Sequence, residues 1–199
     1  METIDLAQGQ VRYRVAGPAD ATEPPVLFVH GLLVNAELWT GVADGLAAQG
    51  IRSYAPDLPL GAHSLPLHPD ADLTPRGVAR LLIAFLEALD LTDVTLVGND
   101  TGGALCQFLL DIDHSRIGRL VLTNCDAFDK FPPAPFNLLV KAGRRPGVLR
   151  ALAAPMRWTW VRHSALGYAP LVRKPLDPEL TRRWSMPVLT DAAVRRDTA

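Results

Sequence analysis

The 199-residue sequence has little cysteine and no excess of charge of either sign. Its two cysteines, Cys106 and Cys125, lie in apolar segments without the paired spacing of a zinc site, so we expect buried thiols rather than a disulfide. No metal-ligand spacing of His, Cys, Asp or Glu is visible, so we predict no metal and no cofactor. Lys and Arg total 20 and Asp and Glu total 21, a balance that argues against nucleic-acid binding.

Long apolar runs are also missing. Residues 1–6 include neither a basic region nor an extended apolar stretch, so we expect no signal peptide, no membrane span and a cytoplasmic protein. Hydrophobic residues nonetheless make up 48% of the chain. A chain of this length and composition can form one domain with a substantial core.

Apolar periodicity predicts strands that alternate with helices over the first two thirds of the chain. Strands are expected at residues 10–15, 26–29, 51–54, 94–97 and 119–123, and helices at 35–49, 75–89 and 104–110. Thr74 and Pro75 are typical of a helix start, and Gly50 is typical of a C-cap. Alternating strands and helices form parallel sheets with right-handed crossovers, so the predicted fold class is α/β.

The composition changes after Asp126. Residues 127–199 hold three of the four tryptophans with many prolines and arginines, and they contain no central-strand pattern. Short helices are expected there at 136–141, 148–153 and 178–184. We therefore predict a core region at 1–126 and a helical cap at 127–199. Trp158, Trp160 and Trp184 are expected either to line an apolar cavity or to serve as packing residues.

The most informative motif is Gly98-Asn99-Asp100-Thr101-Gly102-Gly103, which follows one predicted strand and opens a predicted helix. A strand, a tight glycine-flanked turn and a helix form the context of a nucleophile elbow. The carboxylate of Asp100 is already an anion at neutral pH, so it needs no base before it attacks. The helix N-terminus favours that negative charge. Alternatively, Asp100 only caps the helix, because Asp is a good N-cap residue.

Together with three further segments, the elbow resembles the α/β-hydrolase fold. Val29-His30-Gly31 follows one predicted strand, residues 54–58 follow the next, and residues 114–124 are similar to the sixth strand and its approach. Asp100 in place of Ser is similar to the branch that contains haloalkane dehalogenases, fluoroacetate dehalogenases and epoxide hydrolases. The resemblance covers about residues 4–126. It implies a mostly parallel sheet flanked by helices, followed by a helical cap.

The resemblance also implies a chemistry. Asp100 would form a covalent ester with a small apolar organic substrate that carries a carbon–halogen bond or an epoxide, and would face a cavity beneath the cap. The backbone N–H groups of Leu32 and Thr101 would face the oxyanion when water hydrolyses the ester. Asn124 and Asp126 follow the sixth strand, where some dehalogenases carry a halide-holding Asn and others the catalytic acid. Both residues also fit a turn and a helix start.

Two positions depart from the dehalogenase pattern. Thr101 stands where a large aromatic residue or Arg is usual, and Leu32-Leu33 stands where Asn-Pro or Phe-Pro is usual. Among the histidines, His30 is expected to be structural, and His63 and His68 are expected to be solvated in a Pro-rich loop.

A late histidine is missing. In this fold the order is nucleophile, acid, histidine, with the histidine roughly 150 or more residues after the elbow, and 99 residues follow Asp100. We therefore expect a C-terminally truncated hydrolase without the last two strands, with poor turnover and a frayed tail around Asp191. The exposed sheet edge would favour self-association. Three alternatives stay open: a hydrolase of unassigned substrate, a non-catalytic ligand-binding module, and a scaffold completed by a second chain.

Overall fold

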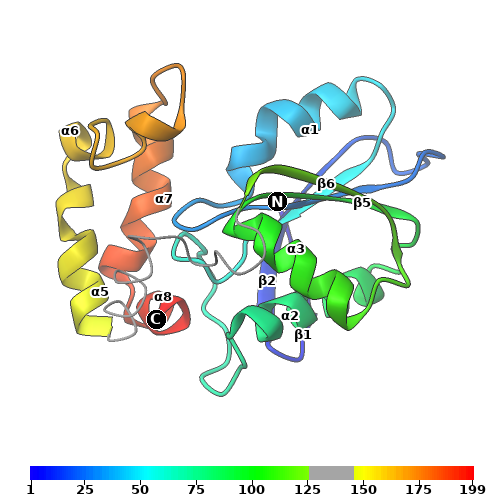
Figure 1. The fold of residues 1–199 in the computed structure, drawn as a ribbon, viewed down its shortest axis with the longest axis horizontal. Coiled ribbons are helices and arrows are strands. Elements are labelled where there is room, and N and C mark those ends of the chain that lie inside the picture. Colours follow the sequence, from blue (N-terminus) through cyan, green and yellow to red (C-terminus); the bar gives the residue numbers. More distant parts are fainter. Residues whose placement is uncertain (126–145) are drawn as a thin grey trace.

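A six-stranded sheet forms the centre of the computed structural model, which describes residues 1–125 and 146–199. The strands lie in the order β1-β2-β4-β3-β5-β6 (Figure 1). Their bounds are β1 Glu2–Leu6, β2 Gly9–Ala16, β3 Val26–Val29, β4 Ser53–Pro56, β5 Val94–Asp100 and β6 Ile117–Cys125. β1, β2 and β4 pair antiparallel, whereas β4, β3, β5 and β6 run parallel. The predicted α/β class with a mostly parallel sheet is confirmed.

Helices cover both faces of this sheet (Figure 1). One face carries η1 (Ala36–Trp39) and α1 (Thr40–Ala47), and the other carries α2 (Pro75–Ala88) and α3 (Thr101–Ile112). β3 shows why both faces are covered: Val26 and Phe28 pack toward η1 and α1, while Leu27 and Val29 pack toward α2 and α3. Successive strand side chains point to opposite faces, so an unbroken apolar run is buried on both.

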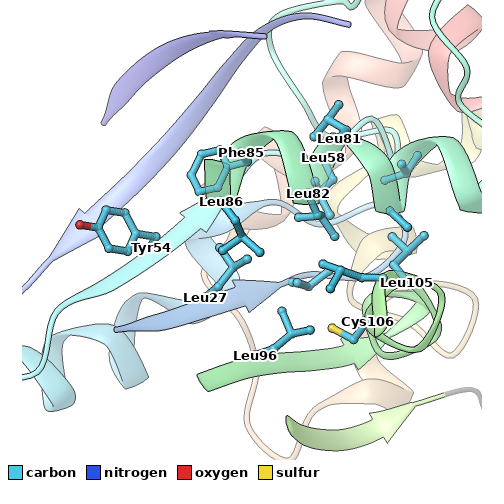
Figure 2. Packing of buried hydrophobic residues seen from close by; sticks show 14 of the residues in the cluster. Leu27, Tyr54, Leu58, Leu81, Leu82, Phe85, Leu86, Leu96, Leu105 and Cys106 are labelled. Carbon is cyan, nitrogen blue, oxygen red and sulfur yellow. The ribbon is translucent and has the colours of Figure 1, made fainter. Parts of the chain in front are cut away.

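The larger core lies between the sheet and helices α2 and α3 (Figure 2). Leu82, Phe85 and Leu86 of α2 are at most 1% exposed and pack with Leu27 and Leu96 of the sheet. Burying one such side chain contributes about 1.5–3 kcal/mol relative to leaving it in water. This layer fixes the position of α3, whose first residue directly follows Asp100.

The boundaries of several elements follow from local hydrogen bonds. The Thr74 hydroxyl accepts the Gly77 N–H at 3.1 Å, so the predicted start of α2 is confirmed. The expected strand at 51–54 begins only at Ser53, because the Ile51 N–H is donated to the carbonyl of Leu46 at the end of α1. Gly50 between them has a φ of 78°, which suits the predicted C-cap. β1 was not predicted.

Residues 146–199 form short helices and, in this described part, no strand. The bounds are α5 Pro146–Ala153, η2 Ala154–Arg157, α6 Thr159–Arg162, η3 Ala169–Leu171, α7 Pro178–Thr190 and α8 Ala192–Thr198. Helices predicted at 148–153 and 178–184 lie within α5 and α7, and the one predicted at 136–141 lies outside the described residues. None of the described helices is long and apolar enough to cross a membrane.

The helical segment, residues 146–199, is anchored to the sheet core through α7. Trp184 is 2% exposed, packs on Tyr168 and donates its indole N–H to Asn35 at 2.8 Å. Trp184 is therefore a packing residue. Trp158 and Trp160 are exposed and stack on each other, so they do not line a closed cavity in the described structure.

The C-terminal tail is ordered, which corrects the expectation of a frayed end. Asp191 caps α8 by accepting the N–H groups of Ala193 and Val194. α8 then continues to Thr198. The cap explains the order, because a carboxylate at this position satisfies N–H groups that otherwise lack a partner.

Asp197 and His63 are both buried, so the expectation that His63 is solvated is wrong. The Asp197 carboxylate accepts the Leu67 N–H at 2.8 Å and lies 3.3 Å from His63 Nε2. Burial raises the pKa of Asp197, but its contacts with His63, the Leu67 N–H and Arg196 outweigh burial and leave that pKa lowered. His68 is exposed, as expected.

Cys106 is a buried thiol, as predicted, and burial raises its pKa. Cys125 is only half-buried.

Asp197→Asn is expected to reduce the free energy of unfolding by about 1–3 kcal/mol at neutral pH, because a buried charged acceptor is lost. The folded-state pKa lies below the ordinary value of 3.8. The contribution is therefore complete above that value and is lost as the pH falls through the folded-state pKa. Urea unfolding of the parent protein and of Asp197→Asn, from neutral pH to below the folded-state pKa, measures this contribution. Asp20→Asn is the control, because Asp20 is exposed. Equal stabilities at pH 7 would contradict the assignment.

Candidate active site

Asp100 lies at the junction of β5 and α3 in an unusual backbone conformation. Its φ is 54° and its ψ is −133°, in a region that L residues rarely occupy. The pairing register of β5 with β6 shifts between Asn99 and Asp100. Such strain costs of order 1–3 kcal/mol and persists only where the surroundings enforce it. The predicted strand, tight turn and helix are all present.

Glycines allow the close packing that enforces this turn. A Cβ on Gly31 would overlap the carboxylate of Asp100. A Cβ on Gly102 would overlap the carbonyl groups that end β3, and one on Gly98 would lie 2.6 Å from the Cα of Gly103. The ends of β3 and β5 and the start of α3 therefore meet backbone against backbone.

The Asp100 carboxylate has a specific hydrogen bond. The Leu32 N–H donates to Asp100 Oδ2 at 3.0 Å. Asp100 makes no capping hydrogen bond to α3, so the interpretation that it only caps the helix is wrong. Thr101 is the first residue of α3, and a contact between its N–H group and this carboxylate stays a prediction.

The loop that carries Leu32 is held by hydrogen bonds to two other segments of the chain. Leu33 has a φ of 56°, donates its N–H to the carbonyl of Leu60 at 2.8 Å and accepts the Tyr168 hydroxyl at 2.8 Å. Tyr168 belongs to the helical segment, 135 residues away in the sequence. Sequence reasoning missed this contact, since a tyrosine in a Pro-rich region has no local signal for its partner.

His30 is structural, as expected. It is fully buried, and its Nε2 accepts the Leu58 N–H at 2.8 Å. Because Nε2 is the acceptor, Nδ1 carries the proton and donates to the carbonyl of Gly31 at 2.9 Å. Burial lowers the pKa of His30, which keeps the ring neutral at physiological pH. Both ring nitrogens are occupied, so His30 is unsuited to act as a base.

A second pair of polar residues fixes the end of β5. Asn99 donates its side-chain N–H to the carbonyl of Thr123 at 2.8 Å, and the Thr123 hydroxyl donates to the carbonyl of Gly98 at 3.2 Å. Asn99 and Thr123 therefore hold the carboxyl ends of β5 and β6 together next to Asp100. Sequence reasoning did not single them out, although Asn99 stands inside the elbow motif.

The remaining predicted site residues have different outcomes. Asn124 lies near the end of β6, one residue before Cys125, the pairing partner of Asp100 in the sheet. Asn124 has a φ of 41° and is exposed. Asp126 lies outside the described residues. Asp100 itself is solvent-exposed in the described part of the chain, and its place in a cavity beneath the cap stays a prediction.

Comparison with known proteins agrees with this geometry. Residues 24–190 match the profile of the family described as alpha/beta hydrolase fold. The chain belongs to the α/β-hydrolase fold family. Two solved structures share the fold. An epoxide hydrolase, CorEH, has a TM-score of 0.76 and 18% identity over 99% of this chain and 70% of its own. A haloalkane dehalogenase, DatA from Agrobacterium tumefaciens, has a TM-score of 0.68 and 24% identity over 99% and 65%.

Curated relatives are longer than this hydrolase-fold chain. A haloalkane dehalogenase of Mesorhizobium japonicum is 41% identical over 150 residues, which are 73% of this chain and 47% of that protein. A putative esterase/lipase of Mycoplasma pneumoniae is 31% identical over 124 residues, which are 61% of this chain and 43% of that protein. The chain thus spans about half the length of these curated relatives.

Gly31→Ala is expected to destabilise the protein by about 1–3 kcal/mol, because the added methyl group displaces the Asp100 carboxylate from the Leu32 N–H. Gly45→Ala is the matched control: Gly45 lies in α1 with open space around it, and a helical Gly-to-Ala change there stabilises by about 0.5–1 kcal/mol. Chemical denaturation compares the two. Equal effects of both substitutions would show that the approach at Gly31 is not tight.

Proposed function

We propose that this chain is an Asp-nucleophile hydrolase of the α/β-hydrolase fold, with Asp100 as nucleophile and a carbon–halogen bond or an epoxide as the point of attack. The observation that carries the proposal is the hydrogen bond from the Leu32 N–H to Asp100 Oδ2 at an elbow with a left-handed φ. The 41% identical dehalogenase and the epoxide hydrolase of like fold support this choice of substrate class. Residues 127–199 would be the cap of the enzyme.

In the first step, an oxygen of Asp100 attacks an sp3 carbon of the substrate. An O–C bond forms as the carbon–halogen bond breaks, and the halide leaves with the bonding electron pair. With an epoxide, the ring C–O bond breaks instead, and the alkoxide takes a proton from water. The nucleophile needs no deprotonation, because a carboxylate is already charged.

In the second step, water attacks the carbonyl carbon of the ester on Asp100. Negative charge then develops on the oxygen that faces the Leu32 N–H, and this donor is already within 3.0 Å in the resting protein. The Thr101 N–H would be the second donor. Asn124, one residue before the strand partner of Asp100, would hold the departing halide. In the alternative assignment, Asp126 would be the catalytic acid.

Hydrolysis of the ester needs a base that activates water. His30 is unsuited to that role, since both of its ring nitrogens are engaged. Losing such a base slows the step by roughly 10²–10⁴. We infer that this chain forms the ester faster than it hydrolyses it, so the ester should accumulate on Asp100.

Incubation with a small haloalkane or epoxide is expected to add one substrate-derived mass to the protein and none to Asp100→Asn. The amide removes the nucleophilic anion while it keeps the shape of the side chain. Asp111→Asn is the matched control, because Asp111 is an exposed carboxylate on α3 whose partner is the surface residue Arg76. Intact-protein mass spectrometry measures the adduct.

Fast turnover with no adduct on Asp100 would contradict the proposal. An adduct that persists in Asp100→Asn would place the reaction on another group.

A non-catalytic ligand-binding module is the second candidate, favoured by the exposure of Asp100 and the engagement of His30. It would bind an apolar ligand with equal affinity in the parent protein and in Asp100→Asn, and it would give no adduct.

We also propose that the edge strand β6 mediates self-association. Among the described strands β6 is an edge of the sheet, and its consecutive residues Leu120, Val121 and Leu122 are 39%, 43% and 39% exposed. An exposed apolar edge strand can pair with another chain.

Val121→Lys is expected to shift the protein toward the monomer, because a charged side chain on an edge strand opposes pairing. Val42→Lys is the matched control, since Val42 is an exposed valine on α1 away from this edge. Light scattering coupled to size exclusion measures the mass. A parent protein that is already monomeric at high concentration would refute the proposed association.

A further inference from the structure

The helical segment contains a cavity whose lining includes no residue of the elbow. The cavity has a volume of about 400 Å³, is open to solvent on one side and is lined by the end of α6, the turn at residues 168–176 and the first turn of α7. In Figure 1, α6 and this orange turn lie together at one end of the helical segment. The backbone confirms this closeness, because the Tyr168 N–H donates to the carbonyl of Arg162 at 2.7 Å. The polar side chains that line the cavity are Arg162, His163, Tyr168, Arg173, Lys174 and Thr181.

The charge of this region has one sign. Residues 146–176 contain five Lys and Arg residues and no Asp or Glu, in a chain whose formal net charge is −1. Among the residues that the structure describes, no acidic side chain lines the cavity. Asp177 and Glu179 follow at the start of α7, but Asp177 accepts the Glu179 N–H and the Glu179 carboxylate pairs with Arg182. The nearest carboxylates in sequence are therefore already engaged.

Arg162 places a buried positive charge in the wall of the cavity. The residue is 2% exposed, yet its guanidinium donates only to neutral oxygens. These include the hydroxyls of Thr181 and Thr159 at 3.2 and 3.0 Å and the carbonyl of Met156 at 2.9 Å. Among the described residues, no carboxylate forms an ion pair with it. A buried cation without a counter-charge is unfavourable, and a bound anion would offset that cost.

The hydrogen bonds at this wall occupy the oxygens that could otherwise repel an anion. The Thr181 hydroxyl donates to the carbonyl of Pro178 at 3.0 Å, and its oxygen accepts from Arg162 Nε at 3.2 Å. His163 Nε2 lies 3.1 Å from the same oxygen. The Tyr168 hydroxyl is turned away toward Leu33, so it adds no acceptor that would repel an anion.

We propose that this cavity binds a phosphate group. Arg173 and Lys174 are exposed at its rim and supply mobile charge-assisted donors, while Arg162 supplies fixed positive charge at the wall. The group belongs either to free phosphate compounds or to a phospholipid headgroup. The headgroup is an option because Trp160, Leu166 and Leu171 of the same segment are 68%, 82% and 77% exposed. Cationic residues interleaved with exposed apolar ones suit a lipid surface.

Titration calorimetry of the full chain with inorganic phosphate, at low ionic strength, tests the site. We expect saturable binding with one phosphate per chain that weakens as sodium chloride is added. The double variant R173Q/K174Q should weaken the Kd by about tenfold or more, since two charge-assisted contacts are lost. Arg182→Gln is the matched control, an exposed arginine on α7 outside the cavity, and should change the Kd less than about twofold.

Vesicles distinguish the two sources of phosphate. If the ligand is a lipid headgroup, the chain co-sediments with phosphatidylglycerol vesicles but not with phosphatidylcholine vesicles, and R173Q/K174Q loses that binding. If the ligand is a free phosphate compound, inorganic phosphate binds and neither vesicle does.

Two results would overturn the proposal. One is the absence of binding to both inorganic phosphate and phosphatidylglycerol vesicles by a protein that folds normally. The other is an equal loss of binding in Arg182→Gln and R173Q/K174Q, which would show attraction to overall charge rather than to the cavity. The outcome is independent of Asp100, since no step uses the elbow.

Discussion

The close approach of two strand ends is the constraint on which the candidate site depends. β3 ends at Val29, and the loop that follows passes so near β5 that a methyl group on Gly31 would overlap the Asp100 carboxylate. The same approach brings the Leu32 N–H within 3.0 Å of Asp100 Oδ2. The left-handed backbone at Asp100 is held by this packing, and without it the residue would relax to an ordinary helix N-cap.

The helical segment contributes to the same loop. Tyr168 and Trp184 reach Leu33 and Asn35, which follow β3, and Asp197 reaches Leu67 in the loop after β4. Each contact joins a side chain to a group more than 100 residues away. Docking of the segment and positioning of the Leu32 donor are therefore coupled, and a change in one is expected to alter the other.

The parts that could be predicted are those with a local cause. An unbroken apolar run predicted strand β3, and a threonine before a proline predicted the start of helix α2. The elbow could be predicted because glycine, acid and glycine stand between a strand pattern and a helix pattern. The role of His30 as a structural residue was predicted from its place before Gly31 at a strand end together with the resemblance to the α/β-hydrolase fold.

The parts that could not be predicted depend on distant partners. His63 looked solvated in a Pro-rich loop, but Asp197 buries it from the other end of the chain. The tail around Asp191 looked frayed, but that carboxylate caps α8, and Asp197 of α8 accepts the Leu67 N–H from the loop after β4. No sequence pattern pointed to Thr123, because its hydroxyl can donate to the carbonyl of Gly98 only when β6 lies beside β5. The solvent exposure of the Asp100 side chain likewise could not be predicted, because it depends on how segments distant in the sequence pack around the elbow.

The measurement that tests the central claim most directly locates the covalent bond. After reaction with an epoxide or a haloalkane, the chain is digested and the modified peptide is sequenced by tandem mass spectrometry. The account predicts that the added mass lies on residue 100, as an ester that hydroxylamine cleaves. Modification of Cys125, His68 or another carboxylate, with residue 100 unmodified, would contradict it.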